Sequence, residues 1–165
     1  MIELESLAEE LKATPFVTLF APRVTDTNLY LTCDGLFLND EFIINILDDE
    51  RFSVGHKTFS NSISFSRTEV KLFLTEVIKS TLEKWLGLVE SKLLSIEPKL
   101  NIINTGISDN VLVFVDFTMP NKKGNFTCRI TKTGKYEFYK DGDLIATAYN
   151  YSYFGVTFTD IHKLY

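Results

Sequence analysis

Two acid and histidine groupings offer residue types that bind metal ions. Asp160 and His162 lie two positions apart, so on a strand they would share one face and hold an ion with a third ligand such as Asp116. Pairs with this spacing are common by chance, and a solvated chain end accounts for them. The acidic run 48–50 supplies oxygen ligands without the glycine-bearing pattern of a calcium loop. We therefore predict no metal site.

The chain contains no short catalytic or cofactor-binding motif. It lacks the patterns of a phosphate loop, a dinucleotide-binding turn, a zinc-protease helix, a serine-hydrolase elbow and a CxxC pair. Neither His56 nor His162 has a neighbouring pattern that indicates a general base. Asp116, Glu137 and Lys140 have the residue types of a nuclease, but residues three apart on a strand point to opposite faces. The sequence favours a protein that is not an enzyme, with no catalytic residues and no cofactor.

Two aromatic-rich segments suit binding to a macromolecule. Positions 122–140 interleave six Lys or Arg residues with aromatic rings, which suits single-stranded nucleic acid. Lysines at hairpin turns also serve solubility or protect sheet edges, and the whole chain has a net charge of −5, so we rank nucleic acid below protein as a partner. The second segment holds Tyr149, Tyr151, Tyr153 and Phe154, which would pair across strands in a core or form a protein interface if exposed. We predict these four as partner-binding residues.

Composition and charge indicate the class of protein and the number of domains. Of 165 residues, 45% are hydrophobic and 24% are charged, the balance of a globular domain, and there is no repeat or linker. We expect a single α+β domain over 1–165. Residues 1–50 hold eleven acids and two bases, whereas 51–165 hold eleven acids and fifteen bases. This uneven distribution of charge either steers a partner or reflects two solvated faces of one domain.

The expected location is the cytoplasm. No run approaches the roughly 20 apolar residues of a membrane helix, and the acidic start of the chain differs from a secretory signal. We therefore expect no membrane partner, and reduced, packed thiols at Cys33 and Cys128.

The strongest local signal is a capping box formed by Ser66 and Glu69, which predicts the start of a helix. Apolar residues continue at helical spacing over 66–96 until Pro98 prevents continuation, and Gly87 is the expected place for any break. Because the apolar arc of this helix is wide, it needs cover on more than one side. We expect that cover from the last strands of the chain, from a second copy, or from both.

The remaining pattern predicts short elements before this helix and an antiparallel meander after it. The predicted elements are a helix over 2–13, strands at 16–20, 29–32 and 36–38 with a tight turn at Asp34-Gly35, a brief helix capped by Asn39 over 40–47, a loop with one strand over 48–64, and strands at 111–117, 126–131, 136–139, 144–149 and 156–159. A long helix followed by a meander resembles the cystatin-like arrangement of a helix gripped by a curved sheet. The likeness is one of element order, so no function is transferred.

By exclusion, we expect a non-catalytic protein-binding module of accessory, immunity or inhibitor type, acting as a homodimer. One alternative is a small-ligand-binding domain or small enzyme with a cavity between the long helix and the sheet. The other is a nucleic-acid binder that uses the Lys-rich hairpins.

Overall fold

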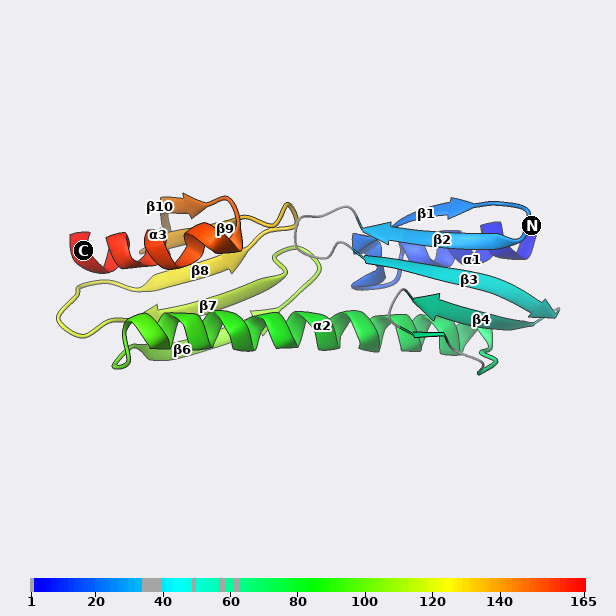
Figure 1. The fold of residues 1–165 in the computed structure, drawn as a ribbon, viewed down its shortest axis with the longest axis horizontal. Coiled ribbons are helices and arrows are strands. Elements are labelled where there is room, and N and C mark those ends of the chain that lie inside the picture. The colour runs from blue at the N-terminus through cyan, green and yellow to red at the C-terminus, as the bar shows by residue number, and fades with distance from the viewer. Residues whose placement is uncertain (1, 34–39, 49, 57–58, 61–62) are drawn as a thin grey trace. The chain divides into compact units, whose positions relative to one another are not determined.

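The computed structural model describes residues 2–33, 40–48, 50–56, 59–60 and 63–165 (Figure 1). Its internal contacts divide the chain into two compact units, Met1–Lys79 and Ser80–Tyr165. We describe each unit by itself, and the single domain over 1–165 stays a prediction. The predicted α+β class, with a long helix packed on a C-terminal antiparallel meander, is confirmed.

The N-terminal unit consists of an antiparallel five-stranded sheet in chain order with helices before and after it. Its elements are α1 (Ile2–Lys12), the 3₁₀ helix η1 (Val17–Leu19), β1 (Ala21–Val24), β2 (Asn28–Cys33), β3 (Asp40–Asp48), β4 (Arg51–His56), β5 (Phe59–Ser60) and the first part of α2 (Arg67–Ile96). Helix α1 is predicted correctly, because Leu4, Leu7 and Leu11 recur at helical spacing and are fully buried.

Three local predictions in this unit are wrong, and the largest concerns residues 40–47. The segment 40–47 is strand β3 rather than a helix, since it hydrogen bonds to β2 on one side and to β4 on the other. Phe42 and Ile44 alternate inward while Leu47 is 53% exposed, as the period of a strand requires. Asn39, the expected cap, lies outside the described residues.

The other errors concern short segments. Within the predicted strand 16–20, Val17–Leu19 form η1, and Phe16 before it has a φ of 68°, which turns the chain out of an extended path. The segment 48–64 contains two strands, β4 and β5, instead of one. The predicted strand at 29–32 is confirmed as β2, whereas the predicted turn Asp34-Gly35 and strand at 36–38 lie outside the described residues.

Helix α2 begins at the predicted capping box. The Ser66 hydroxyl accepts a hydrogen bond from the Glu69 N–H at 3.2 Å, and the Ser66 N–H donates to the Glu69 carboxylate at 3.1 Å. Hydrogen bonding of the carboxylate to the Ser66 side chain and to the Ser66 N–H lowers the pKa of the Glu69 carboxyl. The ionised carboxylate therefore supports the helix start at neutral pH, and this support is lost as pH falls through the lowered pKa. The helix continues without a break through Gly87 to Ile96.

We expect Gly87→Ala to raise the free energy of unfolding by about 0.5–1 kcal/mol. A Cβ added at Gly87 meets no atom within 4 Å, and alanine loses less backbone freedom than glycine on folding. Urea denaturation followed by circular dichroism measures the change. Gly106→Ala is the control, and it should destabilise because its Cβ would lie 2.5 Å from the Phe114 ring. A destabilising Gly87→Ala would show that the glycine is needed for the helix path.

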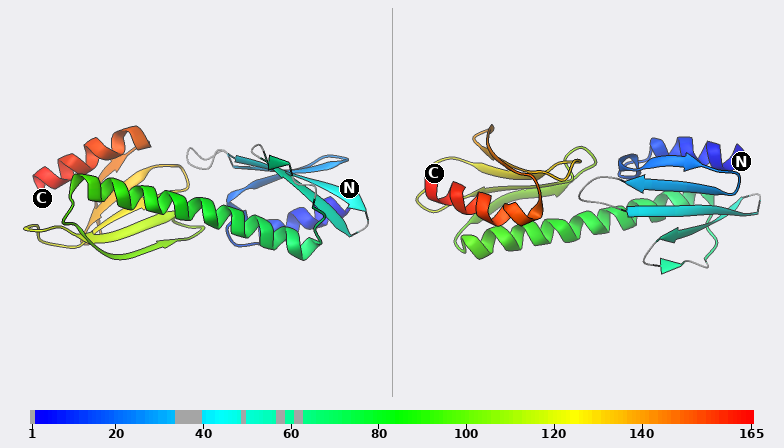
Figure 2. Two further views of the ribbon diagram at one scale, coloured as in Figure 1. Left: turned by 60° about the horizontal axis from the view of Figure 1, so that its bottom comes forward. Right: turned by 45° about the horizontal axis from the view of Figure 1, so that its top comes forward.

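The C-terminal unit places a second antiparallel five-stranded sheet, in the order β10-β9-β8-β7-β6, against two helices (Figure 2). Its elements are the second part of α2, β6 (Asn101–Ile107), β7 (Val113–Thr118), β8 (Phe126–Ile130), β9 (Tyr136–Lys140), β10 (Asp143–Ala148) and α3 (Tyr151–Leu164). Strand residues alternate between a buried face and a half-buried outer face. From the helices, Val89 and Leu93 of α2 and Phe158 of α3 are fully buried.

The meander predicted at 111–149 is confirmed in four strands, but two elements of this unit differ from expectation. The segment 156–159 belongs to helix α3, in which Phe154, Phe158 and Ile161 are buried at intervals of four and three residues. Strand β6 was not predicted, because its two asparagines, threonine and glycine give no apolar alternation. Both cysteines are buried free thiols, as expected.

Candidate functional site

The structure separates the four predicted partner-binding residues into core and surface. Phe154 is fully buried, with its ring centroid 5.0 Å from that of Tyr136 and 5.4 Å from that of Phe138. Tyr149 and Tyr153 are 62% and 58% exposed, and Tyr151 lies between these extremes at 42%. Phe154 therefore anchors the segment from beneath, and only the tyrosines are accessible to a partner.

The exposed residues lie on α3 or just before it. Asn150 precedes the helix in an extended conformation, and His162 and Lys163 place basic groups in its last turn, which suits the helix dipole. Tyr153 and Val156 are three residues apart on α3 and lie on neighbouring positions of its surface, where Val156 is 63% exposed, whereas Tyr149 precedes the helix. We call Tyr149, Tyr151, Tyr153 and Val156 the α3 patch.

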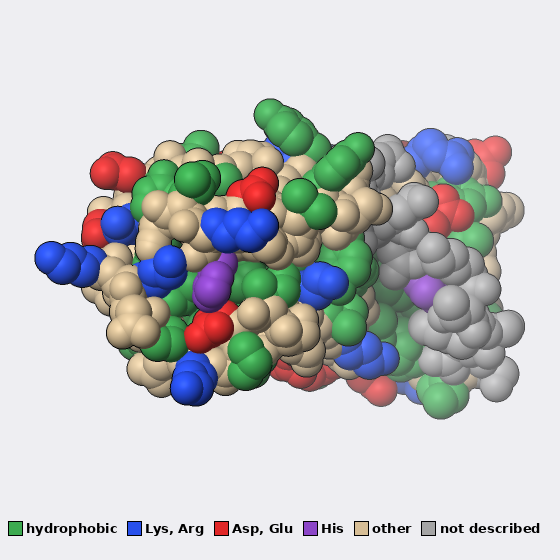
Figure 3. Space-filling view, turned by 60° about the vertical axis from the view of Figure 1, so that its left-hand side comes forward, with side chains coloured by type: hydrophobic (Ala, Val, Ile, Leu, Met, Phe, Trp, Pro, Cys, Tyr) green, Lys and Arg blue, Asp and Glu red, His purple; other side chains and the backbone are tan. Residues whose placement is uncertain are grey.

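A groove lies beside this patch, between α3 and the second part of α2. It has a volume of about 620 Å³ and is lined by Lys92, Ile96, Tyr151, Ser152, Gly155, Val156, Thr159, Asp160 and Lys163. A Cβ at Gly155 would come within 3.0 Å of the Lys92 Cε, so the glycine lets the lysine stem lie against α3. Exposed hydrophobic and basic side chains occur together at this end of the C-terminal unit (Figure 3).

Neighbouring side chains hold the tyrosines of the patch in place. The Lys135 ammonium lies 5.2 Å from the Tyr149 ring centroid, and the Trp85 ring packs edge-on against Tyr151 with centroids 6.4 Å apart. Tyr151 also stacks on Phe154, with centroids 6.1 Å apart. Burial raises the pKa of the Tyr136 hydroxyl beneath them, so this ring stays neutral. Tyr149 and Tyr151 are therefore held against side chains that are themselves packed.

The sequence contains a signal for the patch that was not recognised. Reading 156–159 as a strand puts Val156 on a different element from the tyrosines, and hides its helical spacing from Tyr153. Gly155 and Lys92 gave no signal at all, because their proximity depends on how α2 and α3 pack.

In the basic stretch 122–140, the structure pairs several cations with aromatic rings. The Arg129 guanidinium lies 4.6 Å from the Tyr139 ring centroid, and the Lys140 ammonium lies 5.0 Å from that of Tyr165. Each of these rings therefore has a cation on one face, where a base would otherwise stack. This arrangement favours a structural role for these residues.

The acids and histidine considered for a metal or nuclease site have separate partners. Asp160 and His162 lie on a helix, where a spacing of two puts side chains on different sides, and His162 Nε2 is 3.4 Å from the Glu97 carboxylate. Asp116 accepts a hydrogen bond from the Thr127 hydroxyl at 2.6 Å, and Glu137 accepts one from the Tyr139 hydroxyl at 3.0 Å. No group of three metal-ligating residues occurs in the part of the chain that the structure describes.

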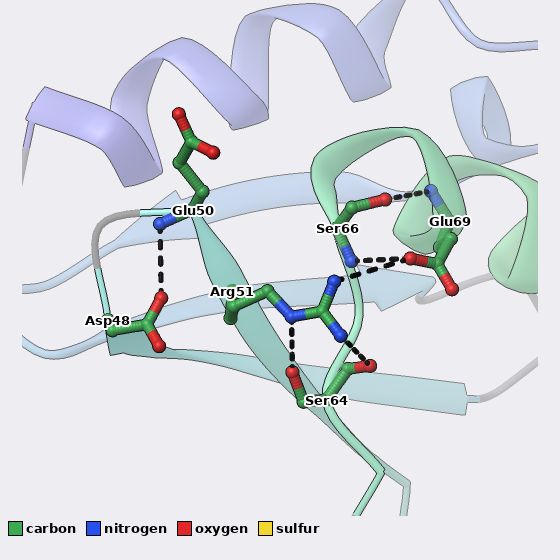
Figure 4. A network of polar contacts seen from close by, with 6 residues as sticks. All are labelled: Asp48, Glu50, Arg51, Ser64, Ser66 and Glu69. Carbon is green, nitrogen blue, oxygen red and sulfur yellow. Dashed lines mark hydrogen bonds and ion pairs between the residues drawn. The ribbon is translucent and has the colours of Figure 1, made fainter.

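A polar network lies at the start of α2 in the N-terminal unit (Figure 4). Arg51 donates to the Ser64 hydroxyl at 2.6 Å and to the Ser64 carbonyl at 3.3 Å, and its guanidinium is 3.6 Å from the Glu69 carboxylate. Asp48, the last residue of β3, accepts a hydrogen bond from the Glu50 N–H at 3.3 Å. Arg51 thus joins β4 to the capping box, and the network supports the fold.

Comparisons with family models, curated proteins and solved structures find no match for this chain. Among the described helices, none combines the length and apolar character that crossing a membrane requires.

Proposed function

We propose that the chain is a non-catalytic protein-binding module whose contact surface is the α3 patch and the groove beside it. The observation that carries the proposal is that Tyr153 and Val156 expose apolar area on one side of α3, whose opposite side is packed in a core, and that Tyr149 is exposed just before this helix. A rigid aromatic surface loses little side-chain entropy on binding, and tyrosine is enriched where interfaces gain most of their energy.

The rim of the groove is suited to a protein partner. Lys92 and Lys163 place positive charge on two of its sides and Asp160 adds a negative group. An apolar centre with a charged rim is the usual composition of a protein interface, since the centre gives affinity and the rim gives orientation. The partner that fits best presents apolar side chains flanked by acidic ones.

The two alternatives have weaker support. The first alternative needs a ligand cavity between the long helix and the C-terminal sheet. Aromatic side chains occupy space between the helices and this sheet: the ring centroids of Phe117 and Phe158 are 5.7 Å apart, and those of Phe138 and Phe158 are 6.0 Å apart. For nucleic acid, the Tyr139 and Tyr165 rings already carry intramolecular cations.

The proposal predicts that a partner captured from native cell extract depends on the α3 patch. We expect wild-type protein to retain one protein at fixed stoichiometry, and Tyr153→Ser/Val156→Ser to lose it. Calorimetry with the purified partner should show binding at least ~10-fold weaker for this variant, or about 1.4 kcal/mol. The matched control is Leu72→Ser, which removes an equally exposed apolar side chain (61%) from the N-terminal unit and should bind as wild type does.

Circular dichroism and urea denaturation of each variant confirm that folding is unchanged. A partner that binds the patch variant as tightly as wild type would overturn the proposed surface. Salt-sensitive binding to oligonucleotides, or turnover of a copurified metabolite, would overturn the proposed function itself.

A further inference from the structure

The edge strands of the two sheets differ in their protection. An edge strand presents unpaired backbone N–H and C=O groups, and proteins usually shield them with proline, charge, bulges or short length. Strand β1 carries Pro22 and Arg23, and β5 has only two residues. Strand β10 begins with Asp143 and is interrupted by a bulge at Ile145. Each of these three edges has at least one such feature.

Strand β6 has a bulge, as β10 does, but it is the longest of the four described edge strands. Its seven residues, Asn101–Ile107, include no charged residue and no proline. Ile103 is 56% exposed at a bulge, and pairing with β7 is regular from Asn104 onward. Among the described residues, β6 hydrogen bonds only to β7, so its outward backbone groups have no protein partner.

The charges that flank β6 complement each other across a two-fold axis. Lys99 lies two residues before the strand and Asp109 two residues after it. When two copies of β6 run antiparallel about their midpoints, Lys99 of each copy approaches Asp109 of the other. Because β6 itself has no charged residue, pairing two copies of the strand places no like charges opposite each other.

We propose that β6 pairs antiparallel with β6 of a second copy, joining the two five-stranded C-terminal sheets edge to edge. The added strand supplies partners for the free backbone groups and covers the half-buried Ile102 and Ile107. This interface is at the opposite edge of the sheet from β10 and uses no residue of the α3 patch. It can therefore be tested separately from the proposed partner surface.

Sedimentation velocity on the full chain, from about 5 to about 500 µM, tests the pairing. We expect wild type to shift from monomer to dimer over this range. Ile103→Lys/Asn104→Lys puts facing positive charges on the edge and should weaken dimerisation at least ~10-fold. Leu144→Lys, which adds charge at an exposed position (53%) on the β10 edge, is the matched control and should dimerise as wild type does.

A charge swap distinguishes this pairing from a general effect of charge. Lys99→Asp and Asp109→Lys should each weaken the dimer, and the double variant should recover it. Hydrogen exchange should show β6 amides that become protected as wild-type concentration rises and stay unprotected in Ile103→Lys/Asn104→Lys.

Three results would overturn the pairing. They are a monomeric wild type at the highest concentration, a dimer unaffected by Ile103→Lys/Asn104→Lys, and a dimer lost in Tyr153→Ser/Val156→Ser but not in the β6 variant. The first two leave the expected result for partner capture through the α3 patch unchanged. The third would show that the α3 patch itself binds a second copy.

Discussion

Phe154→Ala is expected to lower the free energy of unfolding by about 3–5 kcal/mol, whereas Tyr153→Ala should change it by only about 0.5 kcal/mol. The Phe154 ring is fully buried among Tyr136, Phe138 and Tyr151, so its removal leaves a cavity that α3 and the sheet cannot close fully. Tyr153 is 58% exposed and leaves no cavity. Urea denaturation monitored by tryptophan fluorescence and circular dichroism measures both changes.

This pair of variants tests the division of the tyrosine-rich segment into core and surface. Equal effects at the two positions would mean that the segment is not the helix described. The same two variants separate binding from folding. Tyr153→Ala should weaken partner capture while the protein stays folded. Phe154→Ala should be too unstable for its partner binding to be measured.

Phe42→Ala is expected to cost about 3–5 kcal/mol of unfolding free energy, and Leu47→Ala about 0.5 kcal/mol. The Phe42 side chain is 1% exposed, and its ring centroid lies 5.5 Å from that of Phe20 and 5.0 Å from that of His56. Leu47 is 53% exposed at the end of the same strand. Denaturation curves of the two variants give the comparison.

These two substitutions distinguish strand β3 from the helix that the sequence predicts. A helix over 40–47 would bury both Phe42 and Leu47, so both variants would be strongly destabilised. Strong destabilisation by Leu47→Ala would therefore contradict the strand.

The parts of the fold that the sequence predicts are those with local signals. The Ser66–Glu69 capping box and the apolar spacing after it specify α2 without help from other elements. Strands β7, β8 and β9 have alternating residues and short turns, including positive-φ glycines at Gly124 and Gly134. Such signals act within a few residues and can be read directly.

The wrong predictions concern segments whose structure depends on tertiary contacts. The apolar residues of 40–47 fit a helix or a strand, and pairing with both β2 and β4 decides between them. The β-branched and aromatic residues of α3 favour a strand locally, but Phe154, Phe158 and Ile161 reach the core only from a helix.

The candidate site was predicted in part. Sequence identifies the tyrosines as a group, but separating Phe154 from Tyr149 and Tyr153 requires knowing which side of α3 is packed. The groove beside Gly155 arises where two helices meet, and the free edge of β6 depends on strand order. Neither feature has a signature in a short stretch of sequence.

Helix α2 is both the last element of the N-terminal unit and the first of the C-terminal unit. Cleavage of the chain between Lys79 and Ser80 would leave helical pieces of 13 and 17 residues, close to the length of about 12–15 below which an isolated helix is marginal in water. Each fragment would then have to stabilise a newly created helix end. Nicked protein should therefore lose order from the cut outward, and a protease that reaches this peptide bond would destabilise both units together.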